Sequence, residues 1–185
     1  MACETLSTLA LLAQACERCP LHQARIQAVP GQGHPQASVV IIGEAPGKNE
    51  DIQGQPFCGA SGKLLDQLLD SINLNRSKVY ITNLVKCRPP ANRDPLPLEV
   101  SLCTSQFLDP ELALIQPKLI ITLGRHALSH FIPNLQISKV HGQLFKHQNR
   151  PLLALYHPAV ALYNGSHRKT LEQDFLLIPK LLESI

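Results

Sequence analysis

The chain has 185 residues, of which 44% are hydrophobic and 17% charged, which is typical of one globular domain spanning residues 1–185. The formal net charge of +3 is only mildly basic, so it permits a nucleic-acid partner without requiring one. No apolar run approaches the roughly 20 residues that a membrane-spanning helix needs. We therefore expect no contact with a membrane.

The N-terminal segment, residues 1–15, has an apolar middle that Glu4 precedes and that no Lys or Arg precedes. A signal peptide would begin with positive charge, so we interpret this segment as a first helix and expect a cytoplasmic protein. Disulfides are rare in that reducing compartment. The six cysteines are accordingly expected to be metal ligands or buried thiols.

Four apolar segments predict strands, and helical segments separate them. The strands are expected at 38–42, 78–83, 118–124 and 151–158, and the helices at 63–72, from near Pro97 with a break near Asp109, at 125–132 and at 166–184. Pro179 should kink or divide the last helix. Strand, loop and helix repeated four times predict an α/β fold of three layers (αβα) around a mainly parallel, four-stranded central sheet.

A long segment between the first strand and its helix, Gly43 to Gly62, has the sequence GEAPGKNEDIQGQPFCGASG. So long an irregular connection is uncommon in a compact domain unless it has a function. Open α/β sheets bind ligands beyond the carboxyl ends of their strands, and this segment would lie there. We therefore expect the functional site in this segment.

The cysteines suggest a metal centre. Cys16 and Cys19 form a CxxC pair, and Cys87 and Cys103 supply a second, wider pair. Four thiolates suit either zinc or an iron–sulfur cluster. A structural zinc site more often has two closely spaced pairs, and prolines follow these thiolates as in one ferredoxin motif. The spacing predicts a metal but does not decide between iron and zinc.

Polar side chains also follow the other predicted strands. Asn83 ends the second strand, Arg125 and His126 follow the third, and His157 follows the fourth. Each alone has an ordinary interpretation, such as turn capping for an Asn. The carboxyl ends of parallel strands meet at one edge of a sheet, so we expect these groups to gather near Phe57 of the long segment. An aromatic ring, an amide, an imidazole and carboxylates could together hold a planar heterocycle.

Four motifs resemble those of the family 4, iron–sulfur-containing uracil-DNA glycosylases, in the family's order. They are GEAPGKNED (43–51), GQPFCGASGKLL (54–65), YITNLVKCRPPANR (80–93) and YHPAVALYN (156–164). Several long motifs are more specific than one glycine pattern. The resemblance implies a uracil-DNA glycosylase-like fold and hydrolysis of the N-glycosidic bond of uracil in single- or double-stranded DNA. Such an enzyme releases free uracil and leaves an abasic site, as part of base excision repair.

The resemblance implies three residues that hold the base. Phe57 would stack on a uracil flipped out of the helix, an interaction typically worth about 1–3 kcal/mol per base. Asn83 would hydrogen-bond the Watson–Crick edge, because its amide offers a donor and an acceptor. His157 would donate to O2 and stabilise the negative charge on the departing uracil.

The resemblance places further residues around the base. Gly43, Glu44 and Ala45 would lie near the base and the attacking water, and Glu50 would occupy the position of the thymine methyl group. Ala45 stands where other uracil glycosylase families keep a water-activating Asp or Asn, so the general base stays open. Leu162 would be the wedge that enters the DNA.

By the same resemblance, the four cysteines would bind a 4Fe-4S cluster of structural role, with zinc as the less favoured occupant. The expected partner is DNA that contains uracil, bound by a monomer. The rival hypothesis is a metal-stabilised nucleic-acid-binding module without catalysis, in which a degenerate pocket would be expected. A nucleotide-binding α/β protein is disfavoured because the chain lacks GxGxxG and a GKS/T phosphate loop.

Overall fold

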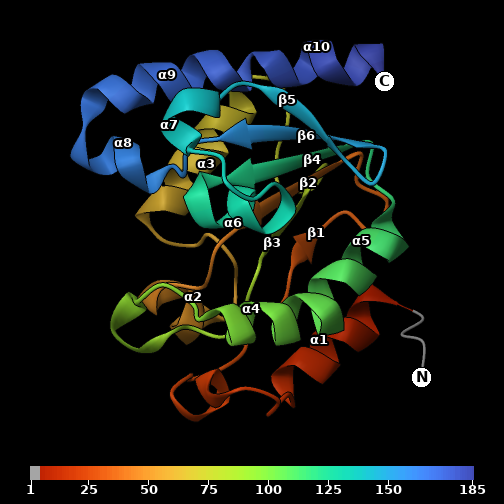
Figure 1. Ribbon diagram of the computed structural model, residues 1–185, viewed down its shortest axis with the longest axis vertical. Coiled ribbons are helices and arrows are strands. Elements are labelled where there is room, and N and C mark those ends of the chain that lie inside the picture. Colours follow the sequence, from red (N-terminus) through yellow and green to blue (C-terminus); the bar gives the residue numbers. More distant parts are fainter. Residues whose placement is uncertain (1–4) are drawn as a thin grey trace.

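The computed structural model describes residues 5–185, so the first four residues of the expected N-terminal helix, Glu4 included, lie outside the described part. Its centre is one six-stranded sheet in the order β1-β3-β2-β4-β6-β5 (Figure 1). The strands are β1 Gln32–Gly33, β2 Val39–Gly43, β3 Tyr80–Asn83, β4 Leu119–Leu123, β5 Leu144–His147 and β6 Arg150–Leu155.

The four central strands, β3, β2, β4 and β6, run parallel and match the four strands expected from the sequence. Their residues are almost all buried, as is typical of strands covered on both faces. The sequence did not predict the two edge strands, β1 and β5, which pair antiparallel with β3 and β6. Strand β1 is two exposed residues long, and β5 is at most half-buried, so neither has the apolar run that marks a buried strand.

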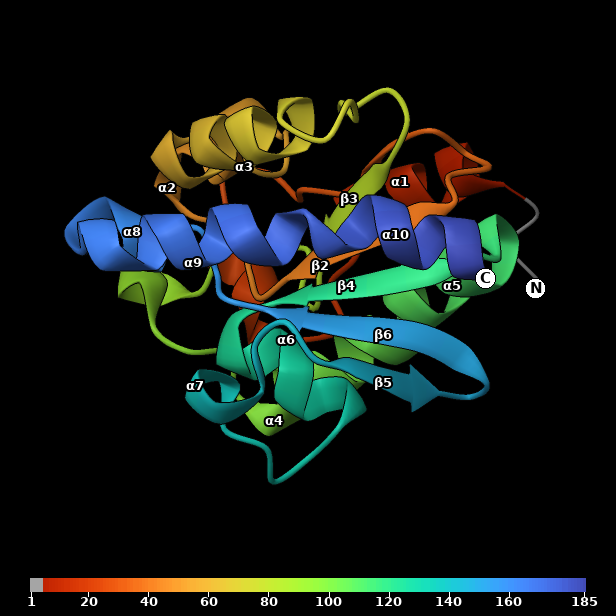
Figure 2. The ribbon, with the colours of Figure 1, turned by 90° about the horizontal axis from the view of Figure 1, so that it is seen from above.

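Helices cover both faces of the sheet. They are α1 Leu6–Gln14, α2 Lys48–Gln53, α3 Ala60–Asp70, α4 Pro97–Cys103, α5 Asp109–Ile115, α6 Gly124–Phe131, α7 Ile137–Val140, α8 Ala159–Tyr163, α9 Gly165–Phe175 and α10 Leu177–Ser184. In Figure 1, α9 and α10 lie above the sheet, whereas α1, α4 and α5 lie below it. Figure 2 shows α9 and α10 crossing over the strands. Within residues 5–185, no helix is long and apolar enough to cross a lipid bilayer.

Two apolar clusters fill the spaces between these three layers. One joins the sheet to α3, α9 and α10 and includes Leu65, Leu69 and Phe175. The other joins the opposite face to α5 and α6 and includes Leu108 and Leu128. Both use alternate residues of the same strands, because successive side chains of a strand point to opposite faces. The expected αβα architecture is confirmed.

The rod formed by α4 and α5 differs from the expected pair of helices with a break near Asp109. A π-helical turn, Thr104–Leu108, joins α4 to α5, and Asp109 itself has helical backbone angles. Pro110 cannot donate a backbone hydrogen bond, and a wider turn before it lets the helix continue. The last helix does divide as expected, at Leu176, where the chain passes from α9 to α10 shortly before Pro179.

The segment from residue 43 to residue 62 is more ordered than its composition suggests. Helix α2 occupies its middle and begins after Gly47. It ends at Gly54, which has a left-handed backbone (φ +68°) and donates its N–H to the Glu50 carbonyl. A glycine at this position ends helices readily because it lacks the Cβ that makes such angles costly. Helix α2 therefore folds the long connection back over the carboxyl ends of the strands.

Candidate active site and cysteine centre

A cavity of about 550 Å³ lies beyond the carboxyl ends of the central strands. In Figure 1 the arrowheads of β4 and β6 mark this end of the sheet. The segments that follow β2, β3, β4 and β6 supply its walls. Most residues singled out from the sequence line it, namely Glu44, Ala45, Glu50, Phe57, Asn83, Arg125, His126 and His157. Gly43 lies directly behind the wall, and Leu162 is not among the lining residues.

Two of the three groups expected to hold the base meet at Gly43, and the third packs against one of them. A Cβ atom added there would come within 2.6 Å of the Phe57 ring and even closer to the amide oxygen of Asn83. The Phe57 and His157 rings are stacked, with centroids 5.5 Å apart and planes 28° apart. The aromatic ring, the amide and the imidazole thus converge on one small volume.

An unusual backbone carries the Phe57 ring. Phe57 has a left-handed φ of +53°, which is costly for a residue with a bulky side chain. The Arg76 guanidinium holds it by donating to the carbonyls of Pro56, at 2.9 Å, and of Phe57, and by pairing with Asp66 at 2.6 Å. Sequence reasoning missed Arg76, because a lone Arg between a helix and a strand carries no local signal.

His157 enters the cavity as a neutral imidazole. The backbone N–H of Ala159 donates to its Nδ1 at 3.1 Å, so the ring carries its proton on Nε2. Burial, which disfavours the charged form, lowers the pKa of His157 to about 4, although the charge of Glu50 acts in the opposite direction. The imidazole can therefore donate a hydrogen bond from Nε2 without carrying a charge.

Several charged or titratable side chains also line the cavity. The carboxylates of Glu44 and Asp94 lie 3.8 Å and 3.2 Å from Nε2 of His126, and the Arg125 guanidinium pairs with Asp94 at 2.8 Å. Burial raises the pKa of Glu44, while His126 partly offsets that shift. The sequence did not single out Asp94, because it lies in a polar, Pro-rich stretch that looks like an ordinary solvated loop.

Glu50 and Leu162 occupy different parts of this region. Oε1 of Glu50 accepts the Gly59 N–H at 3.1 Å, which fixes its carboxylate at the cavity wall. Leu162 lies on α8, outside the cavity, with 47% of its surface exposed. Its neighbour Tyr163 is 91% exposed. Helix α8 thus combines lining residues at its start with exposed apolar groups at its end.

The four predicted ligand cysteines lie around a second, small cavity between α1, the end of β3 and α4. Two donors reach their sulfurs: Arg25 to Cys87 at 2.9 Å, and the backbone N–H of Lys86 to Cys103 at 3.3 Å. Burial raises the pKa of the Cys103 thiol to about 12. Buried thiolates are costly without a cation, so this donor set fits a metal centre.

Comparison with known proteins gives consistent matches. The family model described as "Uracil DNA glycosylase superfamily" matches residues 30–177. A "Type-4 uracil-DNA glycosylase" from Sulfurisphaera tokodaii is 46% identical over 177 residues, covering 90% of this chain and 80% of that protein. Proteins with the same description from Archaeoglobus fulgidus and Saccharolobus solfataricus are 43% and 44% identical, over 96% and 98% of this chain and 94% and 88% of theirs.

These matches cover both the cavity and the sheet that supports it. They also include the strand-end residues Asn83 and His157, which lie within the matched range. The chain therefore belongs to the uracil DNA glycosylase superfamily and, within it, to the type-4 uracil-DNA glycosylases.

Proposed function

We propose that this protein removes uracil from single- or double-stranded DNA by hydrolysing its N-glycosidic bond, and that Phe57, Asn83 and His157 hold the base during the reaction. The observation that carries the proposal is the convergence of three groups: the Phe57 ring and the Asn83 amide meet beside Gly43, and the neutral His157 imidazole stacks on the Phe57 ring. A protein that only bound nucleic acid would not need to enclose these three groups together, so the convergence favours catalysis over the rival binding module.

The spacing of the rings indicates where the base lies. A base held between Phe57 and His157 would need about 7 Å, because each van der Waals gap is about 3.5 Å. The 5.5 Å separation is too small for that arrangement. The uracil would therefore stack on Phe57 and lie beside the imidazole, with O2 facing Nε2. The Asn83 amide would then accept from N3–H and donate to O4.

His157 stabilises the leaving group. As the glycosidic bond breaks, negative charge develops on uracil, and a donor aimed at O2 stabilises that charge more in the transition state than in the ground state. The neutral imidazole supplies this donor from Nε2, since Nδ1 is already occupied by the Ala159 N–H. No proton needs to leave His157 for the reaction to proceed.

The attacking water would lie near Glu44. The Ala45 side chain cannot bind a proton, whereas Glu44 lines the cavity and is the one carboxylate of the GEAPG segment, residues 43–47. The sugar carries positive charge as the bond breaks, so a carboxylate in the cavity both attracts the water and stabilises the sugar. Glu50 would exclude the 5-methyl group of thymine from the same cavity.

The cysteine centre would hold a 4Fe-4S cluster through Cys16, Cys19, Cys87 and Cys103. A single zinc ion would draw the four sulfurs to about 3.8 Å from one another, given Zn–S bonds of about 2.3 Å. Among residues 5–185, only the group of Glu44, Asp94 and His126 brings three metal-type ligand atoms within 4.8 Å of one another. The wider spacing of the thiols favours the cluster, whose contribution here is to cross-link the fold.

The test is Asn83→Ala together with Asn83→Asp, which keeps the side-chain shape but cannot donate to O4. Both variants should slow excision of uracil from an oligonucleotide by about 100- to 1,000-fold, as the loss of one transition-state donor does. Affinity for DNA without uracil should stay near that of the unmodified protein. Cleavage at the abasic site by alkali gives the rate, and near-normal excision by Asn83→Ala would disprove the role of the amide.

A further inference from the structure

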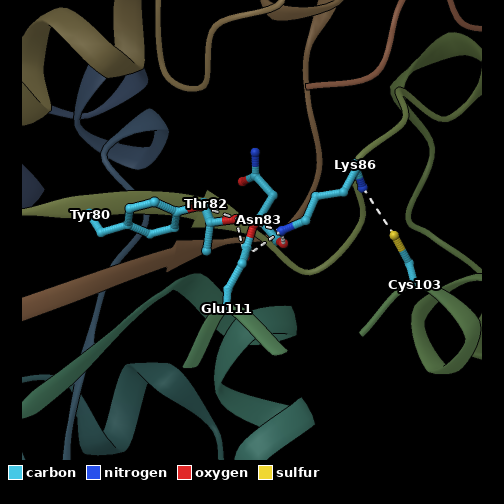
Figure 3. Close-up of polar contacts among 6 residues, drawn as sticks. All are labelled: Tyr80, Thr82, Asn83, Lys86, Cys103 and Glu111. Carbon is cyan, nitrogen blue, oxygen red and sulfur yellow. Dashed lines mark hydrogen bonds and ion pairs between the residues drawn. The ribbon is translucent and has the colours of Figure 1, made fainter. Parts of the chain in front are cut away.

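A fully buried ion pair lies directly behind the base-binding cavity. The Lys86 ammonium is 2.9 Å from Oε2 of Glu111, and the two side chains are 1% and 3% exposed. Figure 3 shows Lys86 reaching back from the chain that leaves β3 to meet Glu111 on α5. An ion pair of this kind is weak evidence for stability, since the loss of hydration offsets most of the attraction. Its role is therefore better sought in the neighbouring groups to which the pair is hydrogen-bonded.

The pair is the centre of a complete hydrogen-bond network. Beside Glu111, the ammonium donates to Oγ1 of Thr82 at 2.5 Å and to the main-chain carbonyl of Asn83 at 3.0 Å, which uses all three of its protons. Glu111 also accepts from the hydroxyls of Thr82, at 3.0 Å, and Tyr80, at 3.2 Å. Such a satisfied network fixes one arrangement of its members.

The carbonyl held by Lys86 belongs to the residue that faces the base. β3 ends at Asn83, and beyond it the chain is held by the Leu84 and Val85 N–H groups, which donate to the carbonyls of Gly43 and Glu44. The Asn83 carbonyl itself accepts from the Lys86 ammonium. The Asn83 amide points away from the network, on the other side of its own backbone (Figure 3). Because a bond to the carbonyl limits rotation of the Asn83 backbone, it also fixes the direction in which the amide points.

The same residue reaches the cysteine centre. The backbone N–H of Lys86 donates to Sγ of Cys103 at 3.3 Å, while its side chain binds the Asn83 carbonyl (Figure 3). Cys87 follows directly. One residue therefore contacts a cysteine sulfur with its main chain and Asn83 with its side chain, so Lys86 links the two sites.

We propose that Lys86, neutralised by Glu111, is a positioning residue that aims the Asn83 amide at uracil and ties that aim to the cysteine centre. The inference rests on the proposed role of Asn83. The new element is that the role of Asn83 depends on Lys86, whose buried ammonium contacts neither the base nor the DNA. Misplacing a catalytic group by about 1 Å can cost about 100-fold in rate, so the effect should be large.

The test is the double variant Lys86→Met/Glu111→Gln, which removes both charges and so avoids leaving one of them buried and unpaired. It is made in the unmodified chain and in Asn83→Ala. Two quantities are measured: single-turnover excision of uracil, and the affinity for DNA carrying uncleavable 2′-fluoro-deoxyuridine relative to the same DNA carrying cytosine. Iron and sulfide content and melting temperature are measured on the same preparations.

In the unmodified chain, the double variant should lower excision by about 100-fold and the relative affinity for the uracil analogue by about 10-fold. In the Asn83→Ala chain it should change neither, because the group it positions is gone. Such non-additivity separates positioning from general damage. Iron content should stay near normal, since the N–H that contacts Cys103 belongs to the main chain. Equal losses in both backgrounds, with or without loss of iron, would overturn the inference.

Arg150→Met is the matched control. Its guanidinium donates to the carbonyl of Leu112, at 3.0 Å, on the same helix as Glu111 but away from the cavity. It should leave excision and relative affinity unchanged. If Asn83→Ala alone leaves the uracil preference intact, the proposed function fails. If Asn83→Ala removes that preference but Lys86→Met/Glu111→Gln does not weaken it, only the positioning role fails.

Discussion

His157 illustrates how single residues prepare this cavity. Its position after β6 sets its backbone, the Ala159 N–H sets which nitrogen carries the proton, and burial sets its charge. Glu44 shows the opposite shift, because burial raises the pKa of a carboxyl. Both shifts favour the neutral form. As the pH falls, Glu44 loses its negative charge earlier than an ordinary glutamate does, and His157 gains its positive charge only near pH 4.

The pH dependence of excision follows from these shifts. A histidine with a lowered pKa keeps its neutral form until the pH falls to about 4. The rate should therefore show no ionisation of His157 in the range of roughly pH 5 to 8, where an ordinary histidine titrates. It should fall on the acid side, first as Glu44 is protonated above the usual range for a glutamate. The measurement is the single-turnover rate across this pH range. In Glu44→Gln, the loss of rate assigned to protonation of Glu44 should disappear. A limb near 6.5 that His157→Gln abolishes would contradict the neutral imidazole.

Substitution of Glu50 should change the choice of base. Removing a steric block to one methyl group is worth roughly 10- to 200-fold, so Glu50→Ala should raise excision of thymine relative to uracil by about that factor. Glu50→Gln is the control, because it keeps the volume and the acceptor that binds the Gly59 N–H. Excision of thymine and uracil from matched duplexes measures the ratio, and an unchanged ratio in Glu50→Ala would end the steric explanation.

At the level of elements, two short helices complete the site. α2 and α8 have six and five residues, too few to be stable alone. α2 supplies Glu50, and α8 begins at Ala159, after His157 and Pro158. Neither has the apolar periodicity that predicts a helix, so the sequence indicated loops at both places. The carboxyl ends of the strands, which the sequence did predict, hold both helices in position.

The exposed end of α8 should act on duplex DNA only. Leu162→Ala should slow uracil excision from a duplex by about 10-fold, equivalent to about 1.4 kcal/mol of the cost of extruding the base. Excision from a single strand should not change, because no base pair has to be opened. Leu11→Ala, at a more exposed leucine on α1, is the control. Equal effects on both substrates would rule out a wedge.

At the scale of the whole molecule, the cysteine centre joins segments that are distant in sequence. Cys16 and Cys19 follow α1, whereas Cys87 and Cys103 lie on the chain that leads from β3 through α4. Their surroundings form a third apolar cluster that includes Phe107 of the π-helical turn. A metal bound there would tie the N-terminal segment to the strand that carries Asn83.

Loss of one ligand should release this connection. The purified protein should be brown and contain iron and sulfide in equal amounts, and Cys87→Ala should lower both together with the melting temperature, by roughly 10 °C or more. Cys58→Ala, at a half-buried cysteine outside the centre, should retain the metal. Metal analysis and thermal unfolding measure these effects, and a colourless protein that carries zinc would contradict the cluster.

The sequence predicted the parallel strands and the strand-end residues because both follow from short-range patterns. Val39 to Gly43 is an unbroken apolar run, and Asn83 and His157 are polar residues placed just after such runs. It could not predict Lys86 and Glu111 in the interior, because charged residues are usually exposed and their pairing joins a coil to a helix 25 residues away. Arg76 was missed because its contacts with the carbonyls of Pro56 and Phe57 also join segments distant in sequence.

Gly43 has a consequence for attempts to change which bases this protein accepts. Any side chain at position 43 would push against Phe57 and Asn83 together, so a mutant library varied there should contain only inactive clones apart from glycine. Position 43 should therefore accept no residue other than glycine in an active enzyme. New substrates, such as larger damaged bases, would have to be gained by substitution at other lining positions, such as Glu50.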